Sequence, residues 1–265
     1  MDEDKTKGPF YLTGSQSLKL MKNVSESLAG RAGIIKMLGL SVRELAKSAY
    51  REPFLPTVEQ MSANDNIDID YSTLVSYIHK GFFPELHETE SDLKDRADYH
   101  SSYFQTYIEK DIKDVLNIQD ESAFIKFVKA CASLTSEMLN MSTLAEICGK
   151  DAKTVRAWLS VPESSGLVYL LEPYHNNFNK RMIKPPIYYY RDADKNEIDL
   201  IIENGDYLHP VEIKTTSDPK KSMVSAFRHL DNIPTKKVGT GAVVCLAKDQ
   251  LPLTDNVWIL PARMV

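Results

Sequence analysis

The chain has 265 residues, of which 43% are apolar, and this predicts folded domains with real cores rather than a disordered tail. Its formal net charge of -5 excludes a protein that coats nucleic acid over its whole surface, because such binding neutralises many phosphates with Lys and Arg. Any contact with nucleic acid must therefore be local.

The cysteines and the N-terminus indicate the compartment. The 3 cysteines, Cys131, Cys148 and Cys245, are odd in number and far apart, which favours neither a disulfide framework nor a zinc ribbon. The first residues, MDEDKTKGPF, are acidic where a secretion signal would be basic and then apolar, and no apolar stretch is long enough for a membrane span. The sequence predicts a soluble, cytoplasmic protein with no membrane partner.

The first half of the chain is predicted to be mostly helical. Apolar residues recur at helical spacing over 38–46, 74–78 and 99–115. Between Glu52 and Asp70 the chain is polar and contains two prolines, which predicts a loop and a domain boundary.

Residues 121–191 have the element order of a winged helix-turn-helix. Three helices are expected over 121–134, 142–148 and 151–166, with Ser142 and Asp151 as N-caps. Residues 167–173 and 187–191 are expected to follow as an antiparallel hairpin. Pro162 lies inside the third helix, where proline removes a backbone N–H and is disfavoured, so it is expected to kink or shorten this helix.

Basic residues gather at the two places where such a domain contacts DNA. Lys150, Lys153 and Arg156 lie at the start of the expected recognition helix, and the wing carries Lys180, Arg181 and Lys184. A domain of this kind also serves for packing or subunit contact with its lysines merely solvated, and the pattern favours neither interpretation.

From residue 187 onward short strands surround one helix, expected over 220–230, which predicts a small α/β unit. Asn204-Gly205 is a strong signal for a type I′ hairpin turn. That turn would place Asp199 opposite Pro210, with Pro210 at a bulge. Alternation then collects polar groups on one face and leaves an apolar face for a helix to cover; the first face carries Glu197, Asp199, Ile201, Leu208, Pro210, Glu212 and Lys214.

The spacing D-x(12)-E-x-K on this hairpin is the core of the PD-(D/E)XK nuclease pattern. Asp199, Glu212 and the Ile213 carbonyl are oxygen ligands of the kind that Mg²⁺ takes, and Lys214 beside them would orient water and balance transition-state charge. The same alternation is also what the solvated face of an ordinary hairpin looks like.

The chain resembles a truncated member of a family of prokaryotic AAA-type ATP-binding proteins that carry a C-terminal domain of unknown function. The resemblance rests on several motifs in the family's order: FYLTGSQSLKLMKNVSESLAGR at 10–31, GFFPEL at 81–86, LNMSTLAEICGKDAKTVRAWL at 139–159, YYRDADKNEIDLIIENG at 189–205 and PVEIKTTSDP at 210–219. It implies a vestigial ATPase part, with Ser15 at a sensor turn and Arg31 as a former arginine finger.

Two departures limit what the resemblance implies. The sequence contains no G-x-x-x-x-G-K-[ST], so the ATP that full-length family members bind is not expected to be used by this chain alone. The family also has a helix with an acidic residue just before the YYRD strand, whereas here Lys184 runs almost directly into Tyr188. One metal-binding carboxylate is therefore expected to be missing.

Taken together, the sequence predicts a multidomain α+β protein. The expected parts are a remnant of an AAA-type ATPase domain at 1–50, a helical lid or linker at 51–119, a winged helix at 120–186 and a restriction-endonuclease-like α/β unit at 187–265. The expected function is nucleic-acid-associated, with DNA as partner, Mg²⁺ as cofactor and metal-dependent nuclease activity left open. The alternative is a non-catalytic regulatory or protein-interaction scaffold that binds itself or a partner subunit.

Overall fold

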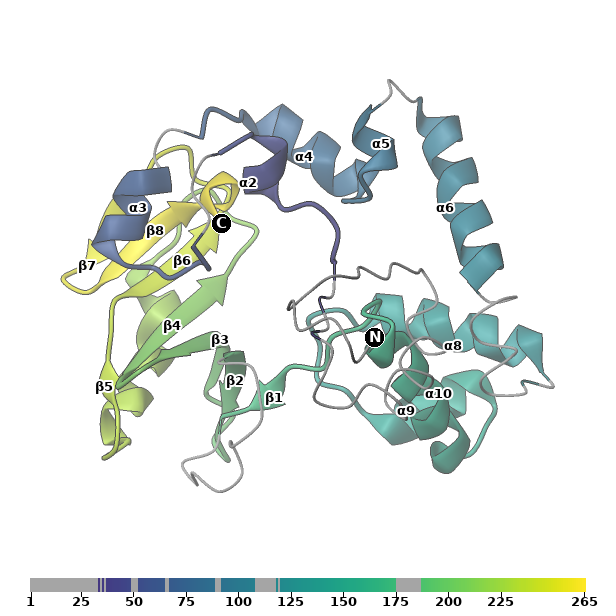
Figure 1. The fold of residues 1–265 in the computed structure, drawn as a ribbon. Helices are drawn as coiled ribbons and strands as arrows, with labels where there is room; N and C mark the ends of the chain where they lie inside the picture. Colours follow the sequence, from purple (N-terminus) through teal and green to yellow (C-terminus); the bar gives the residue numbers. More distant parts are fainter. Residues whose placement is uncertain are drawn as a thin grey trace, which may run out of the picture. The chain divides into compact units, whose positions relative to one another are not determined.

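The computed structural model describes residues 33, 35, 37–48, 52–64, 67–88, 92–107, 118, 120–174 and 187–265. It divides into two compact units, one of helices and one in which helices accompany a mixed sheet (Figure 1). The prediction of an α+β protein with a helical N-terminal half and a C-terminal sheet is confirmed. Within these ranges, no helix is both long enough and apolar enough to cross a membrane.

The helical unit contains the three helices predicted for its second part. They follow α6 (Leu93–Tyr107) and are α8 (Glu121–Ser133), α9 (Met141–Cys148) and α10 (Ala152–Ser164). Each begins at a side chain that accepts hydrogen bonds from free backbone N–H groups of the first turn. These caps are Asp120, Asn140 and Asp151, so the prediction of Ser142 as a cap was wrong by two residues.

The core of this unit is aromatic. Phe124 and Phe127 of α8 are fully buried and contact the Trp158 ring of α10, with ring centroids 5.3 and 5.7 Å apart. α10 continues for two residues past Pro162, whose own carbonyl then accepts hydrogen bonds from the N–H groups of Leu167 and Val168. The proline thus lies in the last turn, and the helix ends soon after it, at Ser164.

The predicted wing hairpin is wrong. Residues 172–173 form β1 (Glu172–Pro173), which pairs with β2 (Ile187–Arg191) in parallel. β2 instead makes its hairpin with β3 (Glu197–Asn204), through a turn in which the Asn196 N–H donates to the Asp192 carboxylate and Lys195 has a φ of 63°. The short Asp192–Asn196 turn therefore joins β2 to β3 as a hairpin.

The second unit is built on one sheet with strand order β1-β2-β3-β4-β6-β8-β7, and β5 pairs beside β4. β2, β3 and β4 are antiparallel, whereas β4, β6 and β8 are parallel. The 3₁₀ segment η3 (Lys221–Asn232) lies between β4 and β5 in the chain. The remaining strands are β4 (Tyr207–Ile213), β5 (Lys237–Val238), β6 (Gly241–Cys245), β7 (Leu251–Thr254) and β8 (Val257–Pro261), followed by the short 3₁₀ turn η4 (Ala262–Met264).

Short helices complete this unit. They are α2 (Val42–Leu45), α3 (Val58–Asn64), α4 (Tyr71–Lys80) and α5 (Glu85–Glu88). α3 contradicts the prediction of a loop between Glu52 and Asp70. Its Met61 side chain is buried against one face of the sheet, so tertiary contact outweighs the polar composition of the segment.

The hairpin of β3 and β4 is present, but its register differs from the prediction by two residues. Ile201 lies opposite Pro210, and Asn204 lies opposite Tyr207, so the two turn residues are Gly205 and Asp206. The even shift by itself moves no residue to the other face. The irregularity in β3 does so for Ile198, which packs with Ile201 and Leu208 and not on the opposite face as predicted. Pro210 pairs regularly, and the irregularity lies in β3, where the step from Ile198 to Ile201 matches only two residues of β2.

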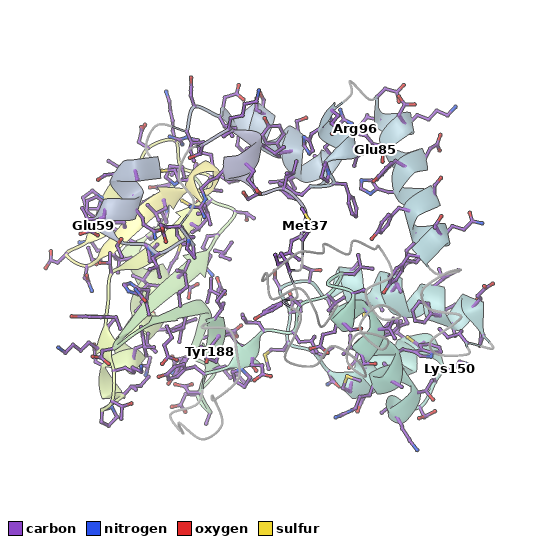
Figure 2. The ribbon with its side chains drawn as sticks, in the orientation of Figure 1. Met37, Glu59, Glu85, Arg96, Lys150 and Tyr188 are labelled. Atoms are coloured by element: carbon purple, nitrogen blue, oxygen red, sulfur yellow. The ribbon has the colours of Figure 1, made fainter. Side chains whose placement is uncertain are left out.

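Both faces of the sheet are covered, which the alternation of polar and apolar residues did not predict. Ile201 and Leu208 pack with Phe227 of η3 on one face. Ile202 and Val211 pack with Met61 on the other. The helix-like segment η3 thus covers the face predicted to be polar. Charge remains on that face at Asp199 and Glu212 toward one end, and at Glu203, which is paired with Lys236, toward the other. Tyr188 of β2 belongs to the η3 side of the core (Figure 2).

Candidate functional site

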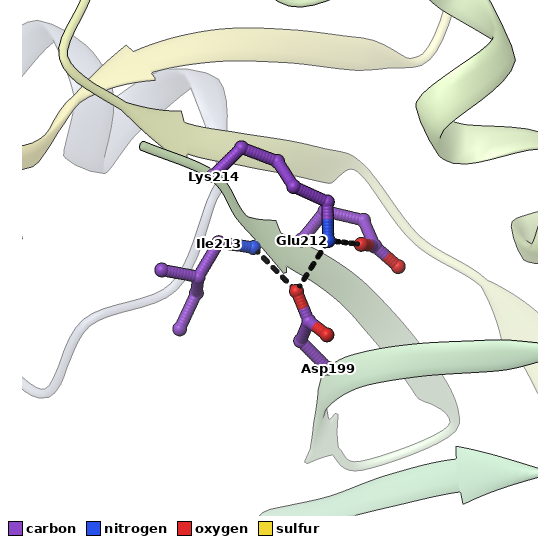
Figure 3. Close-up of polar contacts among 4 residues, drawn as sticks. All are labelled: Asp199, Glu212, Ile213 and Lys214. Atoms are coloured by element: carbon purple, nitrogen blue, oxygen red, sulfur yellow. Dashed lines mark hydrogen bonds and ion pairs between the residues drawn. The ribbon is translucent and has the colours of Figure 1, made fainter. Parts of the chain in front are cut away.

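The Lys214 ammonium group lies between two carboxylates (Figure 3). Its Nζ donates to Asp199 Oδ2 at 2.9 Å and lies 2.5 Å from Glu212 Oε2. The structure therefore brings Asp199, Glu212 and Lys214 together on one side of the hairpin.

The local backbone explains how they meet. Asp199 lies at the irregularity of β3, one position beyond the last pair of the β3–β4 ladder, Leu200 with Val211. There its Oδ2 accepts the Ile213 N–H at 2.8 Å and so takes the place of a ladder carbonyl. Bulges of this kind redirect side chains in sheets. The two-residue change of register places Asp199 next to Glu212 instead of next to Pro210.

Glu212 is the buried member of the site, with 3% of the residue exposed. Burial raises the pKa of its carboxyl to about 7 against the opposing hydrogen bond from Lys214, and the negative charge of Asp199 adds to the rise. Burial alone would lower the pKa of Lys214, but its bonds to Glu212 and Asp199 outweigh burial and raise it. Lys214 therefore stays charged while Glu212 titrates near neutrality.

One oxygen of the site has no partner among the residues that the structure describes. Glu212 Oε1 is buried and accepts no hydrogen bond from them, an arrangement that costs free energy unless another group satisfies it. A divalent cation is such a group, and the donor set fits Mg²⁺ or Mn²⁺ because it consists of hard oxygens: the two carboxylates and the neighbouring Ile213 carbonyl. The described residues contain no group of three or more His, Cys, Asp or Glu side chains suited to a metal, so any such ion would keep several waters.

The residues predicted to contact DNA do not behave alike. Lys150, between α9 and α10 (labelled in Figure 2), is paired with Asp120 at 2.7 Å. Lys153 and Arg156 are exposed on the first turns of α10 and have no ion-pair partner in the ranges that the structure describes. The turn between the helices is three residues long, and its Gly149 has a φ of 63°, a length and composition typical of helix-turn-helix motifs. Lys180, Arg181, Lys184, Ser15 and Arg31 lie outside the described residues.

If α10 contacts DNA, removing two phosphate contacts makes binding less dependent on salt. We expect Lys153→Gln with Arg156→Gln to weaken duplex binding and to make the slope of log affinity against log salt shallower by about 2. Lys150→Gln should change the slope less, because Asp120 already neutralises that lysine.

The matched control removes two exposed lysines from α8, as Lys126→Gln with Lys129→Gln. Fluorescence anisotropy on a labelled duplex at several salt concentrations measures all four proteins. Equal slopes for the α10 and α8 variants would contradict a role for α10 in DNA contact.

A second feature of the sheet unit was not predicted. A cavity of about 760 Å³ lies at the carboxyl ends of β6 and β8, lined by residues 67–71 with Leu74, 245–249 and 261–263. Residues 67–74 form it together with two segments near the C-terminus, so no local motif could have indicated it.

Fold and site together define an α+β protein with a helical unit and a mixed sheet that carries a carboxylate–lysine cluster. Three family models match parts of the chain. Residues 1–46 match a family described as an AAA domain, and two domains of unknown function match residues 71–193 (DUF8612) and 171–265 (DUF4143).

Two curated proteins are similar over nearly the whole chain. They are "Uncharacterized protein Rv2008c" of Mycobacterium tuberculosis and "Uncharacterized protein Mb2031c" of Mycobacterium bovis. Each is 23% identical over an alignment of 307 positions, which covers 97% of this chain. The matched region covers 62% of each relative, so the chain spans less than two thirds of their length. No solved structure matches the chain.

Proposed function

We propose that the protein is nucleic-acid-associated and that its C-terminal sheet carries a metal-dependent, nuclease-like site at Asp199, Glu212 and Lys214. One observation carries the proposal. Lys214 bonds both carboxylates, while the second oxygen of the buried Glu212 has no partner in the described part of the chain. A buried acceptor beside an acid and a lysine is the arrangement expected of a site for a cation and a phosphate. It is not the arrangement expected of an ordinary solvated face of a hairpin.

The fold supports this interpretation. Antiparallel β2, β3 and β4 followed by η3 and parallel β6 have the order of strands expected for a restriction-endonuclease-like core. Asp199, Glu212 and the Ile213 carbonyl would hold the ion, which when bound supplies Lewis-acid activation of water and of the phosphate. Lys214 would then orient the attacking water and offset negative charge that develops on the phosphate.

The helical unit and the N-terminal match extend the proposal. Exposed Lys153 and Arg156 on α10 would hold a duplex by its phosphates and leave the sheet unit to act on it. Residues 1–46 match an AAA domain, but the sequence has no phosphate-binding loop. ATP hydrolysis is therefore not expected of this chain alone.

Binding of Mn²⁺ to the full chain tests the metal site. Calorimetry at pH 8 should detect one site in the wild type and at least about a 10-fold loss of affinity in Asp199→Asn, since one of two charged ligands is removed. Affinity should also rise as pH increases through about 7, where Glu212 loses its proton.

Glu203→Gln is the matched control, because Glu203 lies on the same hairpin but away from the site. Its carboxylate is paired with Lys236 at 2.7 Å. Absence of binding, or an equal loss in the control, would contradict the proposal and favour the alternative of a non-catalytic interaction scaffold. That alternative is supported by one observation, namely that Lys214 is an ion-pair partner of both carboxylates within the chain itself.

A further inference from the structure

The cavity at the carboxyl ends of β6 and β8 shares an edge of the sheet with the carboxylate–lysine site. The Lys214 N–H donates to the Val244 carbonyl at 3.0 Å, and the Leu246 N–H donates to the Thr216 carbonyl at 2.9 Å. The chain after Lys214 therefore runs beside the end of β6, where the lining of the cavity begins. Open sheets bind ligands at the carboxyl ends of their parallel strands.

The walls of the cavity are held in place by Arg263. Its Nε donates to the Ile67 carbonyl at 3.2 Å, and its Nη1 donates to the Lys248 carbonyl at 2.7 Å. One side chain thus ties the segment that leads into α4 to the segment that follows β6. A cavity with fixed walls is preorganised for a ligand.

The lining combines three kinds of group that a nucleotide would use. Tyr71 exposes 61% of its surface and lines the cavity together with the apolar Ile69 and Leu74, which suits stacking with a planar ring. Asp68 and Asp249 are exposed carboxylates with no hydrogen-bond or ion-pair partner in the part of the chain that the structure describes.

These two carboxylates decide the class of ligand. An ionised carboxylate only accepts hydrogen bonds, so the ligand must present N–H donors. Among nucleobases, guanine offers a carboxylate two adjacent donors, the ring N–H and the amino group. Lys248, which also lines the cavity and has no side-chain partner among the described residues, can meet the phosphate of the same nucleotide.

We infer that this cavity binds a nucleobase that carries an amino group, preferentially guanine, from a nucleotide next to the phosphodiester held at Asp199, Glu212 and Lys214. The inference rests on the proposed function for its substrate class. It gives the protein a base preference that the metal site alone cannot supply, because that site contacts only the phosphate backbone.

Two mononucleotides that differ only in the amino group test the inference. Calorimetry of the full chain in metal-free buffer should show guanosine monophosphate binding about 10-fold or more tightly than inosine monophosphate, which lacks the amino group. Asp68→Asn with Asp249→Asn should abolish that preference. Tyr71→Ala should weaken both ligands about equally, by roughly 10-fold, because stacking does not depend on the amino group.

Asp255→Asn is the matched control, since Asp255 is an exposed acid of the same unit outside the cavity. Equal affinity for the two nucleotides, no binding of guanosine monophosphate below about 1 mM, or loss of preference in the control would each overturn the inference. Guanosine preference without Mn²⁺ binding would refute the proposed metal site and leave the cavity assigned. Mn²⁺ binding without guanosine preference would refute the assignment of the cavity and leave the proposed metal site standing.

Discussion

Supercoiled plasmid is expected to be cut by the wild-type chain in Mg²⁺ or Mn²⁺ and to stay intact with either Asp199→Ala or Lys214→Ala. We expect each substitution to lower the cleavage rate by about 100-fold or more, which is the scale on which single charge-stabilising groups act in such sites. Asp199→Ala removes a proposed metal ligand, and Lys214→Ala removes a cation that contacts both carboxylates. Gel electrophoresis of time courses measures the effect.

The control is Lys236→Ala, which breaks the ion pair with Glu203 in the same hairpin without approaching the site. That protein should cut at the wild-type rate, and a chelator should stop every active protein. Cleavage that survives both site substitutions would come from a contaminant or another site. Failure of the wild type in every metal would remove the nuclease proposal.

Glu212→Gln is expected to remove a dependence of stability on pH. The carboxyl of Glu212 has a pKa of about 7 in the folded chain against 4.5 ordinarily, so the folded state holds this proton more tightly than the unfolded state does. Its contribution to stability is therefore fully present below about pH 4.5 and is lost as pH rises through about 7. The loss amounts to about 3 kcal/mol, from a shift of about 2.5 pKa units at 1.36 kcal/mol each.

The measurement compares the two proteins, because other acids contribute their own pH dependence. The Asp192 carboxyl, for example, has its pKa lowered by its hydrogen bond with Asn196 and acts in the opposite direction. In a Trp158→Phe background, Trp258 is the remaining tryptophan and reports unfolding of the sheet unit by fluorescence. The difference in unfolding free energy between wild type and Glu212→Gln should fall by about 3 kcal/mol from pH 4.5 to pH 7.5. A constant difference would show that Glu212 is not buried and coupled as described.

The helices of the first unit could be predicted because their signals are local. Asp151 caps α10, and the buried Val155, Trp158 and Leu159 recur at helical spacing. The cap of α9 was misplaced by two residues because Asn140 and Ser142 have similar capping ability, and the tertiary position of the helix decided between them.

The hairpin was harder to predict because its register depends on a neighbour. The residue types of Asn204, Gly205 and Asp206 permit either of two adjacent turns. The structure adopts the second, which brings Asp199 beside Glu212. The bulge in β3 arises from pairing with β2, a contact that no short stretch of sequence reports.

By itself, the sequence determined which residues have the chemistry: two carboxylates and a lysine at alternating positions, a pair of capped helices and no phosphate-binding loop. Only the tertiary structure decided that Lys214 bonds both acids, that Glu212 is buried with one unsatisfied oxygen, and that a cavity opens at the same edge of the sheet. The physical reason is the range of the forces involved. Capping and alternation act over a few residues, whereas the burial of Glu212 depends on strands that are distant in the chain, such as β6, in which Val243 pairs with Glu212.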